Sequence, residues 1–295
     1  MEYLAQLRTL IAHHAGGQGA PRKIAELNVG IGRWTAPTQP IHSVYEPVVA
    51  IVAQGAKRIV LADRVFNARA GQYSVVTLEL PITFCISEAS EKAPYLALAL
   101  ALKPELIASI LLEANLGDRS TDETAAIGVS QATPELLEPL VRLLRLLERP
   151  SDIAILRPMI EREIIWRLLC SDQGGLVRQI GLADSRLSKI GHTIRWIREH
   201  YAENFRIEDL AERAAMSPTS FHRHFRAATN MSPLQYQKQI RLQEARSRLM
   251  AKTGDVASVG FSVGYESPSQ FSREYARLFG APPSRDAAGL RATLS

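Results

Sequence analysis

The chain has only two cysteines, Cys85 and Cys170, in 295 residues. They lie far apart and show no metal-ligand spacing, which favours two reduced thiols in a cytosolic protein over a disulfide framework. No run of about 18 apolar residues occurs, so we expect no membrane-spanning helix. The first 15 residues have neither a long apolar core nor a cleavage-site pattern. We therefore expect a cytoplasmic protein without a signal peptide.

Sequence signatures of catalysis are also missing. There is no Gly-x-Ser-x-Gly, no phosphate-binding loop and no dinucleotide fingerprint. Of the seven histidines, only His42 lies near the strand-rich part described below, so it lacks the partners that a metal site needs. We expect no catalytic residue, no metal and no cofactor.

Charge is unevenly distributed along the chain. Residues 185–295 hold 17 Lys and Arg against 10 Asp and Glu, a balance of +7, whereas the remainder stands at −2. A basic domain joined to a nearly neutral one indicates a polyanion-binding module attached to a domain of another kind.

Residues 45–103 show the alternation of apolar and polar residues that is typical of β-strands. Residues 57–61 and 65–68 flank Asp63 and predict a hairpin. The clearest strand is predicted over 95–102, where four leucines occupy one face and alanines the other. Several short strands separated by turn signals predict a small antiparallel barrel or sandwich.

Two leucine-rich helices follow, over about 134–148 and 153–170, and their Pro-containing joint predicts a helical hairpin within about 133–171. The hairpin could simply cover an open face of the strand domain, or one leucine face could form a dimer interface; the sequence leaves both open. Gly174 and Gly175 end the second helix, and we expect a linker over 176–190.

The stretch from Ile207 to Pro283 contains one pattern twice. A short apolar helix pattern and a Ser-Pro turn precede a second helix in each copy, which is the arrangement of a helix-turn-helix motif. The two copies are fifty positions apart, with Ser217, Pro218, Phe221, Arg223, Phe225, Asn230 and Pro233 matching Ser267, Pro268, Phe271, Arg273, Tyr275, Gly280 and Pro283.

The second helix of each copy has one apolar and one polar face. The aromatic residues four positions apart are expected in the core, which turns the remaining side chains outward. Arginine can pair with guanine and glutamine with adenine, while Ser, Thr and His can contact bases or phosphates. The candidate DNA-binding residues are Thr219, Ser220, His222, Arg223 and Arg226 in the first copy and Ser267, Ser269, Gln270 and Arg273 in the second.

Between the copies, residues 232–251 predict one helix of about 30 Å. Such a spacer could hold two recognition helices in successive major grooves, which lie about 34 Å apart. Arg241, Arg246 and Arg248 lie along it, and phosphate contacts are as plausible for them as a solvated helix surface. We include Arg241 among the candidate DNA contacts.

The region 207–283 closely resembles the AraC/XylS family of bacterial transcription regulators, through Gly264–Arg273 and Gly280–Pro283. The resemblance implies two helix-turn-helix subdomains joined by a long helix, in agreement with the pattern above. It places base-reading residues at Thr219, His222 and Arg223, and at Ser269, Gln270 and Arg273. Gly260-Phe261 and Met216 depart from the residues common in this family and imply slightly altered turns.

The N-terminal part is similar to a subset of this family with a cupin-like effector domain. The similarity is carried by Val52–Arg58, Leu80–Ile82, Ser87–Ser90 and Pro94–Leu98. The expected architecture is therefore α+β. A cupin-like antiparallel β-barrel with its helical hairpin spans 1–175, and an all-α domain of two helix-turn-helix subdomains spans 191–295.

These expectations describe a sequence-specific transcriptional regulator that binds double-stranded promoter or operator DNA and is associated with the nucleoid. A small-molecule effector in the barrel, a homodimer, and contact with RNA polymerase in an activator are the further partners expected. Alternatives are a ligand-independent regulator whose barrel only dimerises, and a cupin enzyme fused to a DNA-binding domain. The effector pocket is expected at His42, Gln54, Tyr73, Cys85 and Tyr95.

Overall fold

The computed structural model describes residues 2–16, 21–116, 125–182, 185–251 and 255–294. It divides into two compact units. Unit 1 comprises residues 1–191 with 227–230, and unit 2 comprises 192–226 with 231–295. No helix in the described part is long and apolar enough to cross a membrane.

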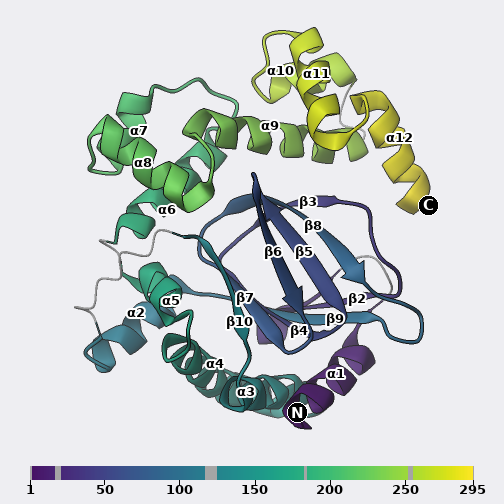
Figure 1. The fold of residues 1–295 in the computed structure, drawn as a ribbon, viewed down its shortest axis with the longest axis vertical. Coiled ribbons are helices and arrows are strands. Elements are labelled where there is room, and N and C mark those ends of the chain that lie inside the picture. The colour runs from purple at the N-terminus through teal and green to yellow at the C-terminus, as the bar shows by residue number, and fades with distance from the viewer. Residues whose placement is uncertain (1, 17–20, 117–124, 183–184, 252–254, 295) are drawn as a thin grey trace. The chain divides into compact units, whose positions relative to one another are not determined.

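Unit 1 is built on two antiparallel sheets (Figure 1). The first has six strands in the order β1 (Arg22–Ile24), β2 (Val29–Trp34), β9 (Tyr95–Ala101), β4 (Val48–Gln54), β7 (Gln72–Val76) and β10 (Ile127–Gln131). The second has four in the order β3 (Ile41–Tyr45), β8 (Leu80–Glu88), β5 (Ala56–Leu61) and β6 (Arg64–Arg69).

The strand domain is therefore two antiparallel sheets and not a closed barrel, so of the two forms that the sequence predicted, a barrel or a sandwich, the structure has the two-sheet one. The chain changes sheets at Gly55, between β4 and β5. Gly55 has φ +78°, and a Cβ there would lie 2.3 Å from the carbonyl oxygen of Glu88, so only glycine fits this corner. The hairpin predicted around Asp63 is present as β5 paired with β6.

Helices cover one face of the six-stranded sheet. They are α1 (Glu2–His14), α2 (Pro104–Glu113), α3 (Pro134–Arg145), α4 (Ile153–Leu169) and α5 (Gly174–Gly181). Leu96, Leu98 and Leu100 of β9 are almost fully buried in the same core as the leucines of α3 and α4. The α3–α4 hairpin thus buries its leucine-rich faces against the sheet, which accounts for its apolar periodicity.

The stretch 176–190 differs from the expected linker. Most of it is helical, in α5 and at the start of α6 (Arg186–Glu199), while residues 183–184 lie outside the described part. Leu176 and Val177 are buried in the unit 1 core. Burial of these two side chains explains why Gly174 and Gly175 begin a helix here, although glycine usually ends one.

Unit 2 is all helical. Its elements after α6 are α7 (Ile207–Arg213), α8 (Pro218–Thr229, of which residues 227–229 are grouped with unit 1), α9 (Pro233–Met250), α10 (Val256–Ser262), α11 (Pro268–Phe279) and α12 (Pro283–Leu294). Leu242, Ala245 and Leu249 of α9 pack in one core with Val259 and Phe271. Two helix-turn-helix motifs, α7–α8 and α10–α11, are thus joined by the long helix α9, as the sequence predicted (Figure 1).

Candidate nucleic-acid interface and cavity

The first motif presents a polar face on α8. Phe221 and Phe225 have no exposed surface, and the ring of Phe225 packs edge-on against Tyr236 of α9 at 5.8 Å between centroids. Because these two aromatics turn inward, the opposite side of the helix faces solvent. Of the residues predicted to contact DNA, Thr219, His222, Arg223 and Arg226 are exposed and Ser220 is partly buried.

The second motif repeats this arrangement on α11. Phe271 and Tyr275 are fully buried, and Ser269, Gln270 and Arg273 are exposed. Ser267 is instead the N-cap of α11, where its hydroxyl accepts a hydrogen bond of 3.3 Å from the Gln270 backbone amide. Each motif therefore exposes one arginine at the equivalent position, Arg223 or Arg273.

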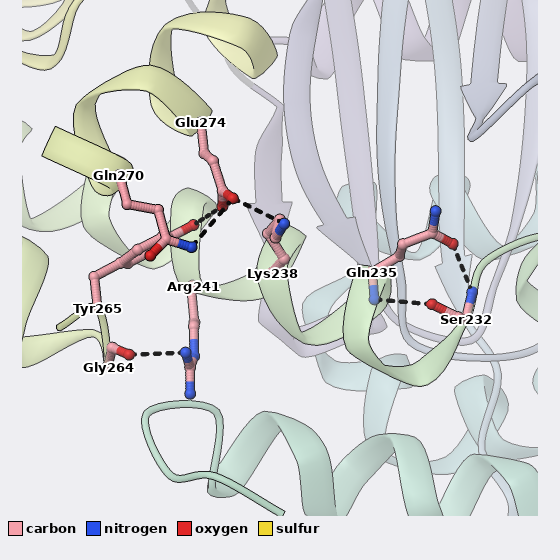
Figure 2. Close-up of polar contacts among 8 residues, drawn as sticks. All are labelled: Ser232, Gln235, Lys238, Arg241, Gly264, Tyr265, Gln270 and Glu274. Atoms are coloured by element: carbon pink, nitrogen blue, oxygen red, sulfur yellow. Dashed lines mark hydrogen bonds and ion pairs between the residues drawn. The ribbon is translucent and has the colours of Figure 1, made fainter. Parts of the chain in front are cut away.

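The helix α9 begins with a capping box, drawn in Figure 2. The backbone amide of Ser232 donates to the side chain of Gln235, and the backbone amide of Gln235 donates to the side chain of Ser232. Its 18 residues correspond to a length of about 27 Å. A capped helix of this length is a rigid spacer between the two motifs.

Arg241 of α9 donates to three backbone carbonyls. Its Nε lies 2.6 Å from the Tyr201 oxygen, Nη1 2.8 Å from that of Gly264, and Nη2 3.0 Å from that of Glu203 (Figure 2 draws the bond to Gly264). Burial lowers the pKa of the guanidinium, although Tyr265 and nearby carboxylates oppose this. These contacts favour a structural role for Arg241 over the phosphate contact that we predicted, because all three of its nitrogens already donate to backbone oxygens and three of its five N–H groups are used.

The neighbouring charged residues of α9 are similarly engaged. Arg246 forms two bonds of 2.8 and 3.0 Å with the carboxylate of Asp286, and Arg248 bonds Glu244, Ser262 and Tyr201. From the sequence, Arg246 and Arg248 could either contact DNA phosphates or lie solvated on the helix surface. Intramolecular pairing occupies both.

Lys238 and Glu274 connect α9 to the second recognition helix. Lys238 Nζ lies 2.9 Å from Glu274 Oε1, and the Tyr265 hydroxyl donates to Oε2 at 2.9 Å (Figure 2). Burial alone would raise the pKa of Glu274, but hydrogen bonds from Lys238, Tyr265 and Gln270 outweigh it and lower that pKa. The ionised carboxylate therefore anchors α11 to the spacer.

Unit 1 contains a cavity of about 530 Å³ between its two sheets. Its floor is the face of the six-stranded sheet opposite to the leucines, where β9 presents Ala97 and Ala99. Gly32 and Gly30 of β2 pair with these two alanines across the strands. Small side chains on neighbouring strands leave room, whereas the large residues of the other face fill the core.

The four-stranded sheet contributes Tyr45, Lys57 and Phe84 to the cavity. Lys57 is 9% exposed, its Nζ donates to the hydroxyl of Tyr45, and it lies 4.0 Å from the ring centre of Phe84. Burial lowers the pKa of Lys57 to about 7. Sequence reasoning missed this residue, although Lys57 alternates with the apolar Ile59 and Leu61, which is the phase of an inward-facing side chain.

Of the five predicted pocket residues, Tyr95 lines this cavity and the other four do not. Tyr73 instead donates to Ser171 Oγ at 2.8 Å, on the helix-covered side, and Gln54 donates to the carbonyl of Pro94. His42 contacts Thr83 Oγ1 at 2.9 Å, and Cys85 is a partly buried free thiol. The prediction chose polar residues near the strands, but alternation directs neighbouring side chains to opposite faces of a sheet.

Two helix-turn-helix motifs on one spacer, following a two-sheet domain, define a class of DNA-binding regulator. Residues 27–176 match the sequence model of the AraC-type transcriptional regulator N-terminus, and residues 210–288 match a helix-turn-helix domain. The first match alone spans just over half of the chain. The chain belongs to the AraC-type family of transcriptional regulators, as the sequence resemblance indicated, and this is not a family of enzymes.

Among curated proteins, the chain is 30% identical over 160 residues to the HTH-type transcriptional activator RhaS of Escherichia fergusonii, covering 54% of this chain and 56% of RhaS. RhaS of Salmonella schwarzengrund is 27% identical over 151 residues, covering 50% and 53%. The chain thus spans about half the length of the curated relatives that it matches.

The fold is similar to that of ToxT from Vibrio cholerae. A structure of ToxT bound to (E)-4-(8-methylnaphthalen-1-yl)but-3-enoic acid aligns with a TM-score of 0.57 at 9% identity, over 88% of this chain and 97% of ToxT. A structure of ToxT with bound unsaturated fatty acid aligns with a TM-score of 0.52 at 10% identity, over 92% and 96%. At these identities the likeness concerns the fold alone.

The role of Arg241 can be tested by comparing Arg241→Ala with Arg226→Ala, a matched change at an exposed arginine. Loss of charged hydrogen bonds to three carbonyls should lower the free energy of unfolding of unit 2 by about 2–3 kcal/mol. Arg226→Ala should leave it unchanged. Unfolding in urea is monitored by hydrogen–deuterium exchange with mass spectrometry, so that the stability of unit 2 is measured from its own peptides. Unchanged stability of Arg241→Ala, together with a salt dependence of DNA binding flattened by about one ion, would restore the phosphate contact.

The burial of Lys57 predicts a pH-dependent stability. Its pKa falls from 10.5 to about 7 on folding, so the unfolded chain holds more protons between these values and stability rises with pH across that window. Lys57→Met should therefore stabilise the protein at pH 7 by up to about 4 kcal/mol, an advantage that disappears as the pH approaches 10. Urea unfolding at several pH values measures this. The exposed Lys23→Met is the control, and a pH-independent difference would contradict the argument.

Proposed function

We propose that this protein is a sequence-specific DNA-binding transcriptional regulator and that unit 2 is its DNA reader. The observation that carries the proposal is the pair of recognition helices, α8 and α11, which expose Arg223 and Arg273 at equivalent positions on one spacer. A single chain of this kind can contact two successive major grooves of DNA without forming a dimer. Family membership supports the same function.

The proposed readers divide by chemistry. Arg223 and Arg273 suit the O6 and N7 atoms of guanine, and Gln270 suits adenine. Thr219, His222 and Ser269 complete the exposed faces. Ser220 and Arg226 lie at the flanks, where phosphate contacts would supply affinity without sequence choice.

We further propose that unit 1 senses a small-molecule effector. The cavity between the two sheets supports this over the alternative of a pure dimerisation scaffold, because the interior of a scaffold would be filled by side chains. An effector shifts the regulator between states only in so far as it binds one of them more tightly. An activator of this kind would also contact RNA polymerase.

Homodimerisation through α4 is part of the proposal. Ile155 and Met159, one helical turn apart, are 70% and 64% exposed, and the neighbouring Leu156 is 38% exposed. Apolar side chains grouped on one helix face are typical of an interface. The double change Ile155→Asp with Met159→Asp should convert a dimer to a monomer in sedimentation equilibrium, with the exposed Val65→Asp as control. A wild-type protein that is monomeric at every concentration would overturn this part.

The readers predict distinct losses in a binding selection. Arg223→Ala and Arg273→Ala should each weaken the free energy of DNA binding by about 1–3 kcal/mol. Each variant should also lose base preference in one half of the recovered site, and the half should differ between the two variants. The two halves of the DNA site should lie about one turn of the DNA helix apart. Selection on genomic DNA fragments with the full chain measures this. If neither variant changes the preferred sequence, the recognition faces are misassigned; if the wild type recovers no site at all, the proposed function fails.

A further inference from the structure

The charged residues around the unit 1 cavity differ in their exposure to solvent. Among the residues that the structure describes, three charged ones line it, and two of them, Lys23 and Glu46, are exposed. Lys57 is the buried one. Within the described chain, no carboxylate lies within ion-pair distance of its ammonium, and Tyr45 Oη is its hydrogen-bond partner.

An ammonium in this position opposes folding. Transfer of a cation from water to an apolar interior is unfavourable unless an anion compensates it, and the aromatic rings of Phe84 and Tyr45 at 4.0 and 4.8 Å compensate it only in part. An apolar residue such as Ile59, two positions along the same strand, would fill the space without this cost. Stability given up at one buried position inside a cavity is the mark of a binding site.

The polar end of the cavity offers two donors to a ligand. The ammonium uses one of its three protons on Tyr45 Oη. Since that oxygen accepts, the hydroxyl proton of Tyr45 points away from Lys57 and remains available. A carboxylate, with two oxygens, can accept from both groups at once.

The rest of the lining is mostly apolar. Its floor is the strip of glycines and alanines on β2 and β9, and its walls include Trp34, Ile86 and Tyr95. Trp34 and Tyr95 pack edge-to-face at 5.8 Å, and Gly32 makes space for the indole, which a Cβ there would meet at 2.3 Å. The volume of about 530 Å³ is typical of small-molecule sites.

We propose that this cavity binds a small monocarboxylic acid with an apolar body, whose carboxylate is held by Lys57 Nζ and the Tyr45 hydroxyl. The proposal deepens, and rests on, the effector function proposed above. A ligand with two charged groups would leave one without a buried partner, and a neutral ligand would leave Lys57 uncompensated. One cation and an apolar lining therefore select one anionic head and an apolar body.

Binding should also take up protons. A carboxylate beside Lys57 stabilises the ammonium, so the acid binds more weakly as the pH rises from 7 towards 9. The other titratable groups facing Lys57 are Tyr45 and Tyr95, whose pKa values burial raises, and at the cavity lining Lys23 and Glu46. Both tyrosines remain neutral across this range, so Lys57 governs the pH dependence.

The test compares ligands that share a body and differ in the head. Octanoate and 1-octanol, and 4-phenylbutyrate and 4-phenylbutanol, are titrated calorimetrically into the full-length protein at pH 7. We expect at least one acid to bind tenfold or more tightly than its alcohol. In Lys57→Met the acid and the alcohol should bind equally, and retained binding of the alcohol shows that the cavity is intact. Tyr45→Phe should reduce the preference several-fold, and Lys92→Met, at an exposed lysine outside the cavity lining, should leave it unchanged.

Three results would overturn the proposal: equal affinity for acid and alcohol in the wild type, an unchanged preference in Lys57→Met, or no binding of either acid. Octanal with cyanoborohydride is the further control. A reduced adduct on Lys57, without any preference for octanoate over octanol, would reassign the cavity to a carbonyl ligand.

The outcome is separable from that of the proposed function, because DNA selection and acid binding are measured independently on the same protein. If the protein binds a specific DNA site but no acid, only the proposed ligand class is rejected. Acid binding without any DNA site removes the regulator function and leaves the cavity assignment in place.

Discussion

The arrangement of unit 2 depends on one guanidinium, that of Arg241, shared among the backbone oxygens of Tyr201, Glu203 and Gly264. These oxygens belong to the segment after α6 and to the turn of the second motif, so one side chain joins both to the spacer. Gly264 makes the approach possible. It has φ +93°, and a Cβ there would lie 2.3 Å from the oxygen of Ala202 and 2.8 Å from Arg241 Cζ.

The same helix uses most of its other charges inside the unit. Lys238, Arg246 and Arg248 each have a carboxylate partner within 3.0 Å. The balance of +7 in residues 185–295 therefore overstates the positive charge that is available to a polyanion. The unpaired basic side chains that matter for DNA are those on the recognition helices, where no carboxylate among the described residues is bonded to Arg223 or Arg273.

Unit 1 uses the two faces of one sheet for opposite purposes. The leucines of β9 pack against helices and supply the core, whereas its alanines, with the glycines of β2, leave a cavity toward the second sheet. Burial of large apolar residues on one face stabilises the domain enough to tolerate, toward the other sheet, a buried lysine whose charge is only partly compensated. The core and the cavity are thus consequences of the same period-two pattern.

Much of this protein could be predicted from local patterns. The fifty-residue duplication, the inward aromatic pairs such as Phe221 and Phe225, and the outward arginines all follow from helical periodicity. The leucine and alanine faces of β9 follow from strand periodicity in the same way. Ser267 was predicted as a DNA contact, yet it is the N-cap of α11, a role that its position before Pro268 could have shown by local geometry alone.

Other features were decided only by the tertiary structure. Periodicity shows which side of an element is apolar, but it does not show which distant backbone atoms a polar side chain will meet. Arg241 lies on the partly exposed side of its helix, and only the folded chain brings the carbonyls of residues 201, 203 and 264 to it. The inward phase of Lys57 follows from alternation, but the separation of the two sheets and the cavity that Lys57 meets between them depend on strand pairing between distant residues. The sequence by itself determined the elements and their faces, while long-range hydrogen bonding and packing determined which faces meet.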